Sequence, residues 1–118
     1  MRISDSEMDI MRIIWDAGCE VTTAYILERL NTQRKKTTVL TFLKRLTDKG
    51  VIETRKNGKT NFYRAKISEE EYKKIQTEEF LKETHSGSLS SFFAALYGGG
   101  HPDKEELDEL REWFENIE

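Results

Sequence analysis

Apolar residues in the first 30 positions recur three and four residues apart, the spacing that places side chains on one face of an α-helix. The first such stretch starts behind Ser4 and Glu7, which have the S-x-x-E spacing of a capping box, and it ends before Gly18. Its apolar face consists of Met8, Met11, Ile14 and Trp15. Thr22 is suited to cap a second, short helix, whose apolar side is made of Tyr25, Ile26, Leu27 and Leu30. The polar run 31–36 then predicts a connection.

The same spacing predicts a third helix over residues 37–49, which ends at Gly50. At 100° per residue, one narrow face of this helix collects Val39, Phe42, Leu43 and Leu46. The opposite face carries Thr37, Thr41 and Lys44, with Leu40 at the border. A solvated helix with this outer face needs no further explanation, but a helix that enters the major groove of DNA has the same composition. The pattern leaves both interpretations open.

A β-hairpin is predicted after the third helix. Its strands cover residues 51–55 and 60–65, and Asn57-Gly58 predicts a type I′ turn because both residues accept a positive φ. The hairpin carries the basic residues Arg55, Lys56, Lys59 and Arg64. Three helices followed by a two-stranded hairpin is the order of a winged helix-turn-helix domain. We therefore assign residues 1–67 to such a domain, mainly α with a small antiparallel hairpin.

Residues 68–118 are predicted to form three further amphipathic helices. Ser68 and Asp103 each begin a capping pattern, and the glycine run at 98–100 separates the last two helices. Their apolar stripes are too wide to be buried among themselves. Burial at roughly 25 cal/mol per Å² favours pairing with a second copy over folding back onto the N-terminal core. The expected dimer interface consists of Tyr72, Ile75, Phe80, Leu89, Phe92, Phe93, Leu96, Tyr97, Leu107, Leu110, Trp113 and Phe114.

The net charge of −3 over 118 residues conceals a strong division along the chain. Residues 34–66 hold 11 basic residues against only Asp48 and Glu53, whereas residues 1–33 carry a net −3 and residues 67–118 a net −9. A basic block between acidic neighbours indicates a surface that faces a polyanion such as nucleic acid. Lysines that merely decorate solvated faces remain the alternative.

Other classes of protein are disfavoured. No stretch approaches the roughly 18 apolar residues of a membrane span, and the N-terminus lacks the apolar run of a signal peptide. We therefore expect a soluble, cytoplasmic protein. No nucleophile, phosphate-loop or metalloprotease motif occurs, so we expect neither an enzyme nor a cofactor. A metal site built from Cys19, His85 and His101 is disfavoured because the three lie far apart in the sequence.

The sequence resembles the penicillinase-repressor family, which comprises repressors of β-lactamase and methicillin-resistance genes and their copper-responsive relatives. The likeness runs along nearly the whole chain. It is carried by Ile3-Ser4-Asp5-Ser6-Glu7, Ile13-Ile14-Trp15, Thr37-Thr38-Val39 with Thr41, Leu43-Lys44-Arg45-Leu46, Lys49-Gly50-Val51, Ser68-Glu69-Glu70-Glu71-Tyr72, Gly87-Ser88-Leu89-Ser90-Ser91 and Glu105-Glu106-Leu107. The resemblance implies a dimeric winged-helix repressor with a C-terminal helical dimerisation unit.

The resemblance also implies which residues meet DNA. The recognition-helix positions fall on Thr37, Thr38 and Thr41, which would contact base edges. Leu40 stands where a lysine is typical, so a thymine methyl is its expected contact. The expected contacts to the DNA backbone are Thr22, Arg34, Lys35, Lys36, Lys44, Arg45, Arg55, Lys56, Lys59 and Arg64.

Two inputs used in the family lack support in this sequence. The antibiotic-responsive branch is cut by a membrane metalloprotease at an Asn-Phe bond, and the equivalent bond here is Ala95-Leu96. The copper branch carries a Cys-x-Cys cluster, which this chain lacks. We therefore expect a sequence-specific transcriptional repressor that binds a palindromic operator in double-stranded DNA as a homodimer. The alternative is a winged-helix module that binds a protein instead of DNA.

Overall fold

The computed structural model describes residues 2–30, 34–100 and 102–117. The chain divides into two compact units, Met1–Gln76 and Thr77–Glu118. This division falls inside a helix, nine positions after the boundary expected between residues 67 and 68, because the start of that helix packs on the first unit. The predicted connection at 31–36 lies partly outside the described residues.

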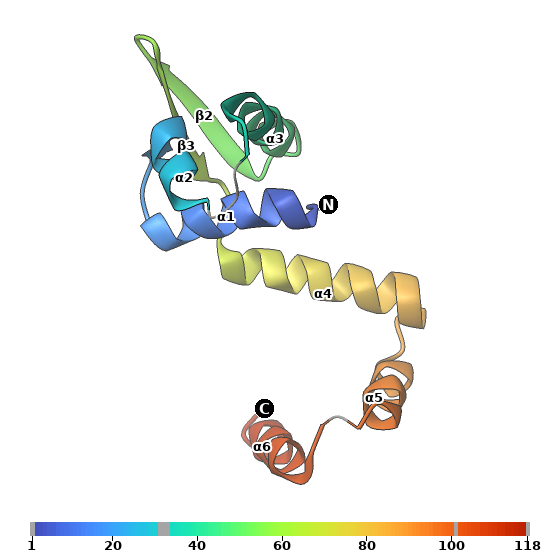
Figure 1. Cartoon of the computed structure of the whole chain (residues 1–118). Helices are drawn as coiled ribbons and strands as arrows, with labels where there is room; N and C mark the ends of the chain where they lie inside the picture. Colours follow the sequence, from blue (N-terminus) through green and yellow to red (C-terminus); the bar gives the residue numbers. More distant parts are fainter. Residues whose placement is uncertain (1, 31–33, 101, 118) are drawn as a thin grey trace. The chain divides into compact units, whose positions relative to one another are not determined.

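The first unit contains the helices α1, α2 and α3, the start of α4 and a small sheet (Figure 1). Its elements are α1 (Asp5–Ala17), β1 (Val21–Thr22), α2 (Thr23–Arg29), α3 (Lys36–Asp48), β2 (Ile52–Asn57), β3 (Thr60–Ala65) and the first turns of α4 (Glu69–His85). The predicted start and end signals are confirmed. Ser4 and Glu7 form the capping box of α1, Gly18 ends it in a left-handed conformation, and the Thr22 hydroxyl accepts the Tyr25 N–H to cap α2.

The sheet has three antiparallel strands in the order β1-β3-β2, one more than the predicted hairpin. Two residues, Val21 and Thr22, form the added strand. The predicted turn on Asn57 and Gly58 is wrong: Asn57 pairs with Thr60, so the two-residue loop consists of Gly58 and Lys59. Gly58 has φ 65° and Lys59 has a negative φ, the pattern of a hairpin with glycine at the first central position.

The core of the first unit lies between α1, α2, α3 and the sheet. It consists of Ile3, Ile10, Met11, Ile14, Val21, Ile26, Val39, Leu43, Leu46, Val51, Ile52, Tyr63 and Tyr72. The predicted apolar stripe of α3 is confirmed, since Val39, Leu43 and Leu46 are buried. The assignment of Tyr72 to a dimer interface is wrong: its ring packs on Trp15 and is buried in this core.

A charged group lies inside the first unit, where it joins two helices. Glu7 is buried, and its Oε1 accepts hydrogen bonds from Lys49 Nζ at 2.7 Å and from the Ser4 N–H at 3.0 Å. Lys49, the C-cap of α3, also donates to the Arg2 carbonyl at 2.7 Å. A buried carboxylate is tolerated because it is paired and hydrogen-bonded. Glu7 therefore ties the start of α1 to the end of α3.

The second unit contains the rest of α4 together with α5 (Leu89–Gly98) and α6 (Lys104–Glu115). The aromatic rings of Phe80, His85, Phe92 and Phe93 contact one another where α4 meets α5. As the structure describes them, α5 and α6 contain no buried residue. The large apolar side chains exposed to solvent in this unit are Phe80, Leu89, Tyr97, Leu107, Trp113, Phe114 and Ile117. Those half-buried are Leu81, Leu96 and Leu110, together with Phe92 and Phe93; Ile75, also half-buried, precedes the unit boundary.

None of the helices in the described ranges is long and apolar enough to cross a membrane.

We predict that Glu7→Gln lowers the free energy of unfolding by about 1.5–3 kcal/mol at pH 7, because the hydrogen bonds lose their ionic partner. Burial alone raises the pKa of Glu7, but the hydrogen bonds from Lys49 and Ser4 and the charge of Lys49 outweigh it, so this pKa lies below its ordinary value of 4.5. The stabilisation is therefore complete above pH 4.5 and is lost as the pH falls through the lower, folded-state pKa.

Denaturant unfolding at a series of pH values tests this prediction. The difference between wild type and Glu7→Gln should shrink in acid, whereas the exposed neighbour Asp5, changed to Asn, should leave the acid dependence intact. A Glu7→Gln protein that retains the full acid dependence of the wild type would contradict the prediction.

Candidate nucleic-acid interface

The burial of one stripe of α3 leaves the opposite face of this helix in solvent. Thr37, Thr38 and Thr41 are exposed, and Leu40 is half-buried at the border. The Thr41 hydroxyl donates to the Thr37 carbonyl at 3.0 Å, one turn earlier on the same helix. Its oxygen lone pairs and its methyl group are therefore left to face an outside partner. An exposed row of threonines offers hydrogen-bond acceptors and methyl groups, two of the kinds of group that contact base edges in the major groove.

Cations surround this threonine face. Lys35 and Lys36 lie at the start of α3, and Lys44 and Arg45 lie farther along it, all exposed. Within the described part of the chain, none of these four forms an ion pair. Arg34 is held more firmly: it donates to Ser6 Oγ at 2.9 Å, and its guanidinium lies 5.4 Å from the centre of the Phe42 ring.

The hairpin has two different faces because side chains alternate along a strand. Ile52, Thr54 and Lys56 lie on the face of β2 toward α3, while Glu53 and Arg55 lie on the other face. Lys56 and Lys59 are exposed at the tip and form no ion pair with any described residue. The tip of the hairpin, the wing of the predicted fold, therefore adds two uncompensated charges.

Two of the arginines expected to contact DNA are paired with carboxylates in this structure. Arg55 donates two hydrogen bonds to Glu20, at 3.0 and 3.1 Å, and Arg64 donates to Glu53 Oε2 at 2.6 and 2.8 Å. The hydrogen bond from Arg55 lowers the pKa of Glu20 and, with the charge of Glu20, raises that of Arg55. This face of the hairpin thus presents little net charge.

The pair of Glu53 with Arg64 follows from the register of the hairpin, so a correctly placed turn would have predicted it. With Asn57 opposite Thr60, counting back along the strands brings Glu53 opposite Arg64. A turn centred on Asn57 and Gly58 shifts this register, so the pair was missed. Nothing local in the sequence indicates the Glu20 partner of Arg55, 35 positions away.

A hydroxyl contact joins α3 to the wing. Thr47 Oγ1 lies 2.8 Å from Thr54 Oγ1 and donates to the Leu43 carbonyl at 2.9 Å, so Thr54 is the donor between the two hydroxyls.

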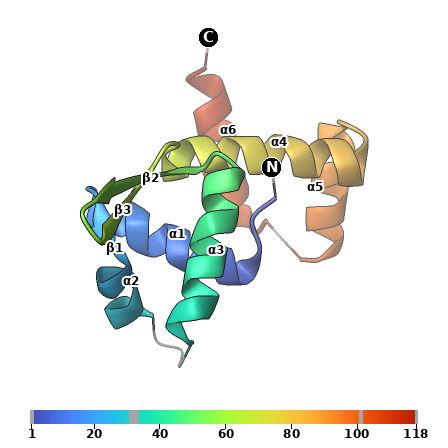
Figure 2. The same ribbon diagram turned by 90° about the horizontal axis from the view of Figure 1, so that it is seen from above.

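Figures 1 and 2 show α3 and the hairpin on the same side of α1. Thr22 is half-buried and serves as the cap of α2. We refer to the exposed threonines, the four cations of α3 and the two cations of the wing together as the basic face: Lys35, Lys36, Thr37, Thr38, Thr41, Lys44, Arg45, Lys56 and Lys59.

No metal site is apparent in the described ranges, where no three His, Cys, Asp or Glu residues come together. Cys19 is exposed, and the His85 ring stacks on Phe80 at 5.4 Å between centres. His101, the third residue of the disfavoured metal sensor, lies outside the described residues.

Comparison with known proteins identifies the family. The profile described as penicillinase repressor matches residues 3–116. The chain belongs to the penicillinase repressor family. It is 30% identical to the penicillinase repressor of Bacillus licheniformis over 115 residues, which are 97% of this chain and 90% of that protein. It is 27% identical to the methicillin resistance regulatory protein MecI of Mammaliicoccus sciuri over 92% of this chain and 89% of that protein. These family members are named as regulators, and the expectation that the chain is not an enzyme is confirmed.

Two solved structures of the same family confirm the fold of the first unit. The solution structure of the DNA-binding domain of the repressor BlaI matches 60% of this chain and 88% of that chain, with TM-score 0.54 and 30% identity. The solution structure of monomeric Bacillus licheniformis BlaI in complex with the blaP half-operator matches 61% of this chain and 89% of that chain, with TM-score 0.52 and 30% identity. The predicted winged-helix fold and the predicted family are both confirmed.

Proposed function

We propose that this protein is a sequence-specific, DNA-binding transcriptional repressor that acts as a homodimer on a palindromic operator. The observation that carries the proposal is the basic face, in which exposed threonines and uncompensated cations of α3 and the wing lie on one side of the first unit. The BlaI structure with a half-operator supports the same use of this fold. A DNA-binding repressor has to be in the same compartment as its operator, and we propose that this protein is cytoplasmic.

We propose that the basic face makes two kinds of contact with DNA, one to base edges and one to phosphates. The base edges are read by Thr37, Thr38, Leu40 and Thr41, and the phosphates are met by Lys35, Lys36, Lys44, Arg45, Lys56 and Lys59. Phosphate contacts fix the register of the protein on the duplex, while base contacts carry the sequence information. Arg34, next to Lys35, and Thr22, the cap of α2, are further proposed phosphate contacts, whereas Arg55 and Arg64 contribute less because carboxylates already pair them.

A second copy of the chain provides the symmetry that an operator needs. Two recognition helices reach successive major grooves about 34 Å apart, which makes the operator palindromic. The exposed apolar side chains of α5 and α6 support an interface in the second unit, because burial of such groups against a second copy removes them from water. Repression then follows from occupation of a promoter.

We predict that the double substitution Lys56→Ala and Lys59→Ala weakens binding to every duplex and flattens its dependence on salt. Each phosphate contact contributes about −0.9 to the slope of log K against log salt, so the slope per protomer should lose about 1.8. A titration of specific and random duplexes at several salt concentrations measures both effects. Salt-independent binding of the wild type would favour the protein-binding alternative.

The matched control for the wing is the pair Glu20→Gln with Arg55→Gln. It removes one positive and one negative charge together, so the slope and the affinity should stay close to those of the wild type. A slope change as large as that of the lysine variant would contradict the division between the two faces of the hairpin.

We predict that Thr41→Val relaxes the base preference at one position of each half-site. Valine keeps the branched shape and a methyl group but removes the hydroxyl acceptor, and the loss of one base contact costs about 1–3 kcal/mol of discrimination. Thr41→Ser is the converse control, since it retains the hydroxyl and removes the methyl. Selection from randomised operators should return a changed consensus for Thr41→Val and the wild-type consensus for Thr41→Ser; an unchanged consensus for both would remove Thr41 from base recognition.

We predict that Trp113→Ser with Phe114→Ser dissociates the dimer. Both side chains are largely exposed in the single chain, and each adds roughly 1.5–3 kcal/mol when buried in an interface. Glu109→Ser with Glu112→Ser, on the same helix, is the control for the loss of helix propensity. Sedimentation should show a monomer only for the first variant, which should bind a half-operator normally; a dimer of unchanged stability would place the interface elsewhere.

A further inference from the structure

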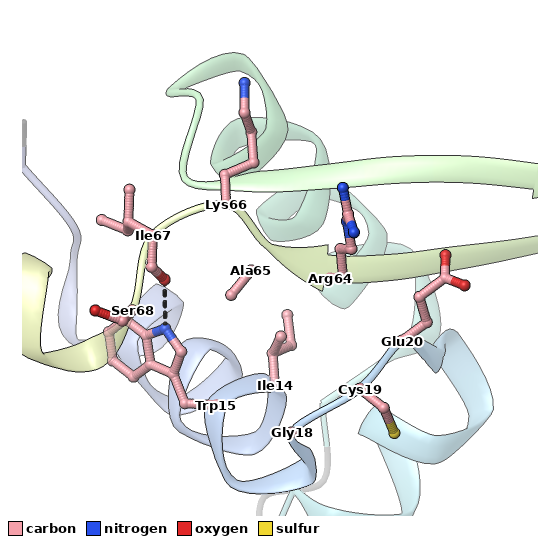
Figure 3. Close-up of a pocket in the computed structure, with 10 residues that line it drawn as sticks. All are labelled: Ile14, Trp15, Gly18, Cys19, Glu20, Arg64, Ala65, Lys66, Ile67 and Ser68. Carbon is pink, nitrogen blue, oxygen red and sulfur yellow. Dashed lines mark hydrogen bonds between the residues drawn. The ribbon is translucent and has the colours of Figure 1, made fainter.

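The Trp15 indole joins two parts of the first unit that are far apart in the sequence. Its Nε1–H donates to the Ile67 carbonyl at 3.0 Å, across 52 positions of the chain. Ile67 lies in the short connection between β3 and α4, and Figure 3 shows the indole pointing to this connection from α1. The preceding residue is fixed as well, because the Lys66 N–H donates to the Val51 carbonyl at 2.9 Å.

Trp15 also holds the first turns of α4. Of the 17 residues of α4, all described, Tyr72 alone is buried. Its ring lies 5.7 Å from that of Trp15, between centroids, at an angle of 41°. Ser68 Oγ accepts the Glu71 N–H at 3.0 Å and caps the helix at the same place. One indole therefore contacts both the residue that leads into α4 and the residue that anchors it.

Close packing does not surround this junction. A cleft of about 440 Å³ opens beside Trp15 and is lined by Ile14, Gly18, Ala65 and Ile67, among others (Figure 3). The cleft borders the connection that leads into α4, at Ala65, Lys66, Ile67 and Ser68. The indole contacts this connection through its hydrogen bond to Ile67, and it contacts the start of α4 through the Tyr72 ring.

We propose that Trp15 is a positioning residue that sets the direction in which α4 leaves the first unit and, through it, the half-site separation that the dimer accepts. This inference rests on the proposed function. A 17-residue helix is about 25 Å long, so a tilt of roughly 15° at its base displaces its far end by about 6–7 Å. That displacement is comparable to the rise of about two base pairs. If the direction of α4 varies, simultaneous binding to two half-sites at a fixed separation is weakened. Binding to a single half-site is unaffected.

The test compares the full-length wild type with two replacements at position 15. Trp15→Phe removes the N–H donor and part of the ring, and Trp15→3-benzothienylalanine keeps the bicyclic shape but removes the donor. Each protein is titrated against a half-operator duplex and against palindromes whose half-site separation changes in steps of one base pair. Simultaneous engagement of both half-sites raises the affinity by about 100-fold or more, and only where the geometry permits it.

We expect the wild type to show this gain at one separation. Both variants should bind the half-operator within about twofold of the wild type, while their gain on palindromes falls by about tenfold and spreads over neighbouring separations. Tyr72→Leu should spread the preference in the same way, because it removes the other contact of the indole. Circular dichroism and dimer sedimentation accompany each variant.

Three results would overturn the inference or its basis. Variants with the wild-type separation preference would show that Trp15 does not set the direction of α4. If the Trp15→3-benzothienylalanine variant no longer binds the half-operator, Trp15 supports the fold as a whole and not the direction of α4. A wild-type chain that binds neither duplex would instead overturn the proposed function.

Discussion

The architecture of the basic face depends on the burial of one narrow stripe of α3. Val39, Leu43 and Leu46 are almost completely removed from water against α1 and the sheet, which fixes the rotation of the helix about its axis. Once that rotation is fixed, the threonines on the opposite side have to face solvent. The ion pair of Glu7 with Lys49 then holds the C-terminal end of α3, and the Thr47–Thr54 contact holds the wing beside it.

Charge in this protein is arranged by folding more than by composition. The middle third of the sequence is strongly basic, but three of its cations pair with Glu7, Glu20 and Glu53. Exposed ion pairs stabilise a fold by only about 0–1 kcal/mol. The ion pairs on the hairpin therefore matter less for stability than for where the positive charge of the surface remains unpaired. The uncompensated charge is concentrated on α3 and the wing tip, on the side that carries the exposed threonines.

The two units differ in how much of their apolar surface they bury. The first unit closes its own core, whereas α5 and α6 leave large side chains such as Tyr97 and Trp113 in solvent. Such surface is costly to leave in water, and the proposed homodimer would bury it against a second copy of the chain. Trp15 contacts the connection that leads into α4 and the Tyr72 ring at the start of this helix, within the first unit.

The sequence alone determined the features whose causes are local. The helices begin at Ser4, Thr22 and Asp103 because their side chains cap the residues that directly follow, and the spacing of apolar residues decides which face of α3 is buried. Only the tertiary structure decided the features that depend on distant partners. Glu20 meets Arg55 across 35 positions and Trp15 meets Ile67 across 52. A one-residue shift of the turn, from 57–58 to 58–59, moves every cross-strand partner in the hairpin by two residues. Local propensity and periodicity carry no information on such pairs, because the chain has to close a loop before the two groups can meet.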